Sequence, residues 1–151
     1  MRNIVFISLL MIVSTHAFAS SSSCTIARDA LAEEAIKNTH DWDSLRETYL
    51  QFEGCDNGGT AELFSDLIVR LLADPSNDLY KLMTYTNRNK SFRQFILHHV
   101  NSTASADDLK SASNRVNFVC PKSTRMFCSA LHAQLDAAMA DLADATKTGK
   151  P

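Results

Sequence analysis

Glycine is scarce in this chain and is confined to two places. Three of the four glycines cluster at Gly54, Gly58 and Gly59, and the fourth is Gly149 near the C-terminal end. Proline occurs only three times. Folds made of strands joined by tight turns need many more of these residues, and no segment alternates apolar and polar side chains as a half-buried strand does. The shortage argues against a β-fold and favours an all-α one.

Long hydrophobic runs are lacking after the first nineteen residues. Arg2 precedes an apolar stretch, Ile4 to Val13, that is too short to cross a bilayer, and a small-residue cleavage site ending at Ala19 follows it. We therefore predict a signal peptide at residues 1–19 and a single helical domain at residues 20–151, soluble in the periplasm. All four cysteines lie beyond the predicted cleavage site, in a compartment where disulfides persist.

An excess of positive charge is also lacking, since the formal net charge is −2. A nucleic-acid-binding domain is normally basic, so this class is not expected. The charge is uneven, with ten acidic and three basic residues between Ser20 and Asp66. This uneven charge could steer a basic partner, or it could be ordinary solvated helix surface. The candidate partner-binding acids are Glu33, Glu34, Asp41, Asp43 and Glu47.

Motifs that carry chemistry are lacking too. The chain has no G-x-S-x-G, H-E-x-x-H or C-x-x-C sequence and no phosphate-cradling glycine loop. His98 and His99 are neighbours whose side chains diverge on a helix, so they cannot chelate one metal ion, and His99 is predicted to be a hydrogen-bonded packing residue. Asp56-Asn57-Gly58-Gly59 lacks the distant glutamate of a calcium loop and is predicted to be a turn. We predict no enzyme, no metal and no cofactor, although residues from separate helices could still meet in space.

Apolar residues spaced by three and four occur in successive segments, which predicts a compact bundle of about six or seven helices. The first helix is expected after Ser23 as its cap, with Ile26, Ala30 and Ile36 facing inward. The others are expected at about 42–53, 60–73, 75–85, 91–100, 106–119 and 124–145. Pro75 is expected to open the fourth helix, Asn87 to Asn89 to form its exit loop, and Val119 to face inward.

The cysteine pairing follows from this helix pattern. The first two helices are of similar length and are joined by a tight turn, so they should form an antiparallel hairpin. Cys24 begins this hairpin and Cys55 follows it, which returns both to the same end. Cys120 and Cys128 flank the short turn at Pro121. We therefore predict the disulfides Cys24–Cys55 and Cys120–Cys128.

A second candidate surface is basic and aromatic, around the turn between the fourth and fifth helices. Aromatic and arginine side chains together are common at protein interfaces, although core tyrosines beside a solvated loop would give the same pattern. The candidate residues are Tyr80, Lys81, Tyr85, Arg88 and Arg93, with Lys90 in the same turn.

The segment from Phe52 to Asp66 (FEGCDNGGTAELFSD), with Trp42-x-x-Leu45 before it and Cys120-Pro121 after it, resembles a set of small exported helical proteins of proteobacteria. The resemblance covers residues 42–128 and implies a periplasmic helical protein, with no residue-level function to carry over. In size, export, helicity and disulfides, the chain is also similar to the periplasmic immunity proteins that neutralise type VI secretion effectors. That likeness is an analogy of fold without a motif.

The leading hypothesis is a periplasmic immunity or inhibitor protein that occludes the active site of a secreted effector enzyme, with the acidic hairpin docking on a basic target. The alternatives are an envelope adaptor or chaperone-like protein with an exposed apolar patch, and a small-ligand carrier with an internal apolar cavity. The expected partner is a protein, and the oligomeric state stays open, a homodimer included.

Overall fold

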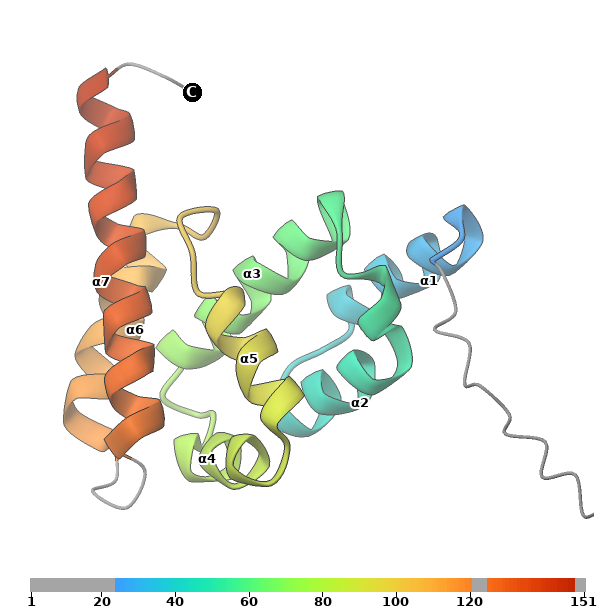
Figure 1. Ribbon diagram of the computed structural model, residues 1–151, viewed down its shortest axis with the longest axis horizontal. Helices are drawn as coiled ribbons and strands as arrows, with labels where there is room; N and C mark the ends of the chain where they lie inside the picture. Colours follow the sequence, from blue (N-terminus) through green and yellow to red (C-terminus); the bar gives the residue numbers. More distant parts are fainter. Residues whose placement is uncertain (1–23, 121–124, 149–151) are drawn as a thin grey trace, which may run out of the picture.

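The computed structural model describes residues 24–120 and 125–148 (Figure 1). These residues form seven α-helices and one short 3₁₀ helix, and no strand occurs among them, which confirms the all-α prediction. The elements are α1 (Ile26–Lys37), α2 (Trp42–Phe52), η1 (Glu53–Cys55), α3 (Gly58–Ala73), α4 (Leu79–Arg88), α5 (Lys90–His98), α6 (Ala106–Val119) and α7 (Arg125–Thr148). The predicted signal peptide, the predicted cap Ser23 and the last residues 149–151 lie outside the described residues.

Helix α3 lies at the centre of the bundle. It packs against α6 on one side and α1 on the other, and α6 in turn packs against α7 (Figure 1). Its apolar face is almost completely buried, as the spacing of its leucines and Phe64 predicts. Around it, one main core joins residues of all seven helices. A smaller cluster of Ala32, Phe52 and Cys55 lies under the α1–α2 hairpin.

An aromatic cluster fixes α2 and α5 against α3. The ring of Tyr49 lies 4.6 Å from the ring of Phe95 and 5.2 Å from that of Phe92, measured between centroids. Phe64 meets Phe95 edge to face at 5.0 Å. Such pairs add to the stabilisation that burial alone provides. The spacing of apolar residues in α2 and α5 predicts this inward face correctly.

The ends of several helices differ from the expected ones. Helix α1 is capped by Thr25, whose side chain accepts a hydrogen bond from the Arg28 amide. Ile26 is 92% exposed and Ala30 is exposed as well, while Ala32 and Ile36 are the buried residues of this helix. The prediction for Ile26 and Ala30 was wrong because these two residues are exposed, while α1 packs mainly against α2 and α3 among the described residues.

The start of α4 was also predicted wrongly. The helix begins at Leu79 with Asp78 as its cap, and not at Pro75. The carboxylate of Asp74 accepts hydrogen bonds from the amide and hydroxyl of Ser76, both at 2.8 Å, and this local turn competes with helix formation. At its other end α4 continues through Arg88, and Asn89 is at once the last cap of α4 and the first cap of α5.

The α6–α7 pair forms the opposite end of the molecule from α1 (Figure 1). Ser105 caps α6: its hydroxyl accepts a hydrogen bond from the Asp108 amide at 3.1 Å and donates to the Asp108 carboxylate at 2.8 Å. Val119 is 38% exposed, so its predicted inward position was wrong, because the last turn of α6 is outside the core. Helix α7 continues to Thr148, three residues beyond the expected end at 145.

Both predicted disulfides are confirmed. Cys24 is bonded to Cys55 across the hairpin, and Cys120 to Cys128 between α6 and α7. Disulfides of this kind are compatible with an oxidising, exported compartment. Among the described residues, no helix combines the length and the apolar character needed to cross a membrane.

Candidate functional site

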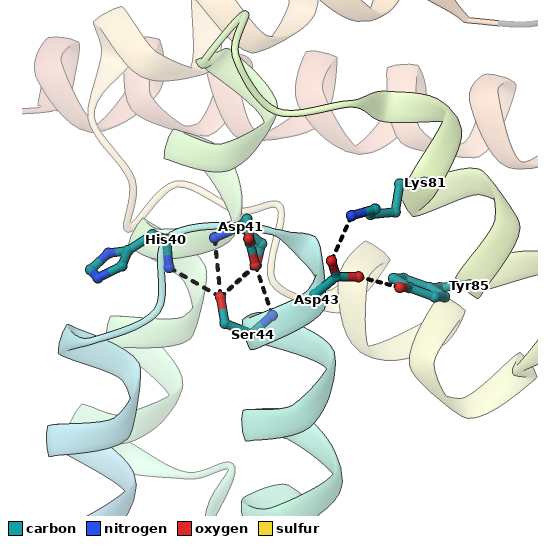
Figure 2. A network of polar contacts seen from close by, with 6 residues as sticks. All are labelled: His40, Asp41, Asp43, Ser44, Lys81 and Tyr85. Carbon is teal, nitrogen blue, oxygen red and sulfur yellow. Dashed lines mark hydrogen bonds and ion pairs between the residues drawn. The ribbon is translucent and has the colours of Figure 1, made fainter.

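The predicted acidic surface begins at the turn into α2, where Asp41 has a local structural role. Its carboxylate accepts a hydrogen bond from the Ser44 amide at 2.8 Å (Figure 2). In return, the Ser44 hydroxyl oxygen accepts a hydrogen bond from the Asp41 amide at 3.2 Å. This is a capping box, and the hydrogen bonds from Ser44 hold the pKa of Asp41 below its usual value. The Asp41 carboxylate is therefore already used within the molecule, where it stabilises the start of α2.

Asp43 connects the predicted acidic surface to the predicted basic one. Its side chain extends from the first turn of α2 toward α4, where Lys81 Nζ lies 2.5 Å from Asp43 Oδ2 and the Tyr85 hydroxyl donates to Asp43 Oδ1 (Figure 2). The hydrogen bonds from Lys81 and then Tyr85 lower the pKa of Asp43. The same contacts raise the pKa of Lys81 and of Tyr85. The charge of Asp43 is thus matched within the molecule.

The remaining predicted acids separate into two environments. Glu47 is exposed on α2, and Glu34 accepts a hydrogen bond from the side-chain amide of Asn38 at 3.0 Å. Glu33 instead lines a groove of about 570 Å³ between α1 and α3. The structure therefore does not assemble the five predicted acids into one face, and Glu33 is the one that lines this groove.

This acidic groove contains two carboxylates that the sequence analysis did not select, Glu62 and Asp66 of α3, together with Gly59, Leu63 and Thr103. Glu33 pairs with Lys37 at 3.7 Å, and Asp66 pairs with Arg70 at 2.9 Å, each on its own helix. Glu62 has no ion pair among the described residues. Exposed pairs of this kind are worth little and exchange easily for other partners. The groove can therefore present three negative charges to a cationic segment.

The predicted basic surface also separates. Tyr80 is exposed, and the guanidinium of Arg93 donates to the Thr86 carbonyl oxygen at 3.0 Å. Arg88 lines a second pocket, of about 350 Å³, with Arg46, Tyr85 and Asn89. The guanidinium carbon of Arg46 lies 5.3 Å from the centre of the Tyr85 ring. Arg46 is not among the predicted residues, because it belongs to α2 and lies far in sequence from the rest of the pocket, which belongs to α4 and the start of α5.

A third polar cluster, also missed from the sequence, lies inside the bundle. The hydroxyl of Ser65 and Nδ1 of His99 are 2.9 Å apart, and His99 Nε2 is 3.0 Å from Asp56 Oδ1, in an orientation poorly aligned for a hydrogen bond. Asn101 donates to the Ser65 hydroxyl at 3.0 Å. His99 is thus a packing residue with a hydrogen bond, as predicted, and it joins α3 to the turn after η1.

The order Ser65–His99–Asp56 matches the residue types of a hydrolytic triad. However, Ser65 is 2% exposed and His99 is 1% exposed. A cavity of about 570 Å³ borders Asp56, but its lining, which comes mainly from α5 and α7, includes neither Ser65 nor His99. A substrate carbonyl cannot reach the hydroxyl in this arrangement. The cluster is best explained as a buried polar tie in which the Ser65 hydroxyl pairs with His99 and Asn101.

One further group of potential metal ligands lies around the Cys24–Cys55 disulfide. Among the described residues, Cys24, Cys55 and Asp29 bring their sulfur and carboxylate atoms within 4.8 Å of one another. The two sulfurs are joined to each other and therefore do not offer thiolates. Asp29 accepts a hydrogen bond from the Thr60 hydroxyl at 2.6 Å, which ties α1 to α3. This group is a structural junction.

Comparison with family models, curated proteins and solved structures finds no match to this chain. The resemblance to small exported proteobacterial proteins therefore stays a prediction.

Proposed function

We propose that this chain is an exported binding protein of the immunity or inhibitor type, which blocks a secreted effector enzyme by occluding its active site. The observation that carries the proposal is the acidic groove between α1 and α3, with Glu33, Glu62 and Asp66 along it. An enzyme that acts on anionic polymers has a basic cleft, and charge complementarity gives an inhibitor both fast association and specificity.

The position of the groove refines the docking face. The proposed face is the α1–α3 groove and not the α2 edge of the hairpin, because Asp41 caps α2 and Asp43 is held by two partners from α4. The ion pairs of Glu33 and Asp66 each involve a single exposed partner on the same helix. The two disulfides support the exported location in the proposal, since they keep a small domain rigid in an oxidising compartment. A rigid groove loses little conformational entropy on binding.

The test is protection of cells against the toxicity of an exported effector enzyme, should a gene for one lie beside the gene for this chain. Co-expression of the wild-type chain should abolish toxicity, and the double variant Glu33→Gln/Glu62→Gln should lose protection because two groove charges are gone. The matched control is Glu34→Gln/Glu47→Gln, which removes two acids from α1 and α2 outside the groove lining. Unchanged toxicity with the wild-type chain, or equal loss in both double variants, would contradict the proposal.

A second candidate function is an envelope adaptor that binds through an apolar patch. It is favoured by the α6–α7 end, where Phe118, two residues before Cys120, is 91% exposed and Met126, two residues before Cys128, is 87% exposed. Exposed large apolar side chains in one region mark interaction surfaces. Replacing both Phe118 and Met126 by Ser should then abolish partner capture while the acidic-groove variants leave it unchanged.

A further inference from the structure

The pocket between α2, α4 and α5 differs from the acidic groove in charge and lies elsewhere on the molecule. Its lining is Arg46 from α2, Tyr85 and Arg88 from α4, and Asn89 at the junction of α4 and α5. We propose that this pocket binds the phosphate group of a small phosphate monoester. This site is independent of the effector-binding function, because it shares no lining residue with the groove.

Two guanidinium groups provide the recognition. Arg46 is held over the face of the Tyr85 ring at 5.3 Å, so its planar group is oriented before any ligand arrives. Tyr85 is itself fixed because its hydroxyl donates to Asp43 (Figure 2). Arg88 is exposed and has no ion pair among the described residues. Paired arginines bind phosphate oxygens through parallel charge-assisted hydrogen bonds.

The start of α5 follows directly on Asn89, which lines the pocket. Asn89 is the cap of this helix, and its side-chain oxygen accepts from the Phe92 amide at 2.9 Å. The cap leaves the first two amides of the helix, Lys90 and Ser91, available at the positive end of the helix dipole. Amides in this position bind tetrahedral oxyanions readily.

The local charge favours a dianion over a single carboxylate. Arg46, Arg88, Lys90 and Arg93 all belong to the elements that form the pocket. Asp43, the acid that is hydrogen-bonded to Tyr85 of the pocket, is already matched by Lys81 at 2.5 Å. A phosphate monoester is close to doubly charged at neutral pH, and a volume of about 350 Å³ leaves room for the organic group that it carries.

The test is titration of the oxidised chain at neutral pH and fixed ionic strength with inorganic phosphate and with glycerol phosphate, followed by amide chemical shifts. We expect both probes to shift the Lys90 and Ser91 amides, and acetate to have a much weaker effect. Arg88→Gln should weaken binding about tenfold, since one charge-assisted hydrogen bond is lost. Arg46→Lys should weaken it too, because an ammonium cannot replace the planar fork.

The matched control is Lys110→Gln, which removes one exposed positive charge on α6 and should leave phosphate binding unchanged. Absence of shifts at Lys90 and Ser91, equal loss in Lys110→Gln, or equal binding of acetate would overturn the proposal. Vesicles of phosphatidic acid carry the same chemical group on a lipid. Binding to these vesicles without binding to glycerol phosphate would overturn the small-ligand assignment in favour of a membrane headgroup.

Discussion

The two ends of the molecule differ in how much polar contacts add to apolar packing. At the α1–α2 end, Trp42, Leu45 and Tyr49 of α2 belong to the main core, the satellite cluster of Ala32, Phe52 and Cys55 is small, and polar contacts tie the hairpin down as well. Arg28 donates to the Gln51 carbonyl oxygen, Asp29 accepts from Thr60, and Asp43 binds Lys81. At the α6–α7 end, the two helices contribute their buried residues to the main core, chiefly Leu109, Ala112, Val116, Leu131 and Leu135.

This difference shows which conditions each end should sense. Apolar burial changes little with pH and does not depend on redox state. The stabilisation from a disulfide is lost in a reductant, and that from a hydrogen-bonded ionisable group changes with pH. Both ends carry a disulfide, so reductants should destabilise both, and the hairpin end more because its disulfide closes the longer loop. Changes in pH should act mainly on the hairpin end. Since the proposed acidic groove and phosphate pocket both use hairpin residues, Glu33 and Arg46, changes there should reach the candidate sites first.

The largest effect is expected from removing the hairpin disulfide. The Cys24→Ala/Cys55→Ala variant opens a loop with a sequence separation of 31, and loop-closure entropy predicts a loss of about 4 kcal/mol in the free energy of unfolding. Cys120→Ala/Cys128→Ala opens a separation of only 8, for which the same relation predicts about 2.5 kcal/mol. Urea unfolding of both variants measures the two values.

The comparison between the two variants is its own control, because each removes one disulfide from the same chain. If the α6–α7 variant lost as much stability as the hairpin variant, the account of the two ends would be wrong. In that case the main core would not hold α6 and α7 together without the covalent bond.

The sequence predicts well those features that depend on local spacing. The apolar periodicity of α2, α3 and α5 identifies buried residues such as Tyr49, Phe64 and Phe95. The expected hairpin identifies the Cys24–Cys55 disulfide, and the short turn between the last two helices identifies the Cys120–Cys128 disulfide. Prediction from the sequence fails where a tertiary neighbour is absent. Ile26 has the right spacing in α1 for burial, yet no helix covers that face.

The candidate sites are harder to predict because their residues come from separate helices. The acidic groove joins Glu33 to residues of α3, and the phosphate pocket joins Arg46 to residues about 40 positions away. The polar cluster of Ser65, His99 and Asp56 has the same character. A count of charges along the chain shows that the N-terminal part is acidic, but it does not show that Asp43 is matched by Lys81.

Alkaline pH should destabilise the protein through Tyr49, a residue of the hairpin helix α2. Burial, followed by the nearby charge of Glu53, raises the pKa of Tyr49 from 10.0 to about 12. The folded state thus keeps a proton that the unfolded state loses, so stability is complete below pH 10 and falls between pH 10 and about 12. The expected loss is about 2 to 3 kcal/mol.

Urea unfolding across this alkaline range measures the effect of Tyr49. Tyr49→Phe keeps the ring against Phe95 but has no phenol to ionise, so its stability should decline less as the pH rises. Tyr80→Phe, at an exposed position on α4, is the matched control and should behave like the wild type. A decline that is identical in wild type and Tyr49→Phe would show that another group controls the alkaline limb.

The smallest effect is expected at Asp43, on the acid side. Lys81 and Tyr85 lower the pKa of Asp43, so its contribution to stability is present above its unfolded value of 3.8 and is lost as the pH falls through the lower folded value. Asp43→Asn should therefore be slightly less stable than the wild type at neutral pH. This difference in stability should become smaller in acid, where the wild type loses the contribution of the carboxylate. Glu47→Gln, at an exposed acid one helical turn further along α2, should leave the stability at neutral pH and in acid unchanged.

Because Tyr85 orients Arg46, we also expect Asp43→Asn to weaken phosphate binding while the acidic groove is unaffected. Thermal unfolding and phosphate titration of the two variants measure these outcomes, and an Asp43→Asn variant that binds phosphate more tightly would show that the carboxylate repels the ligand instead of orienting its site.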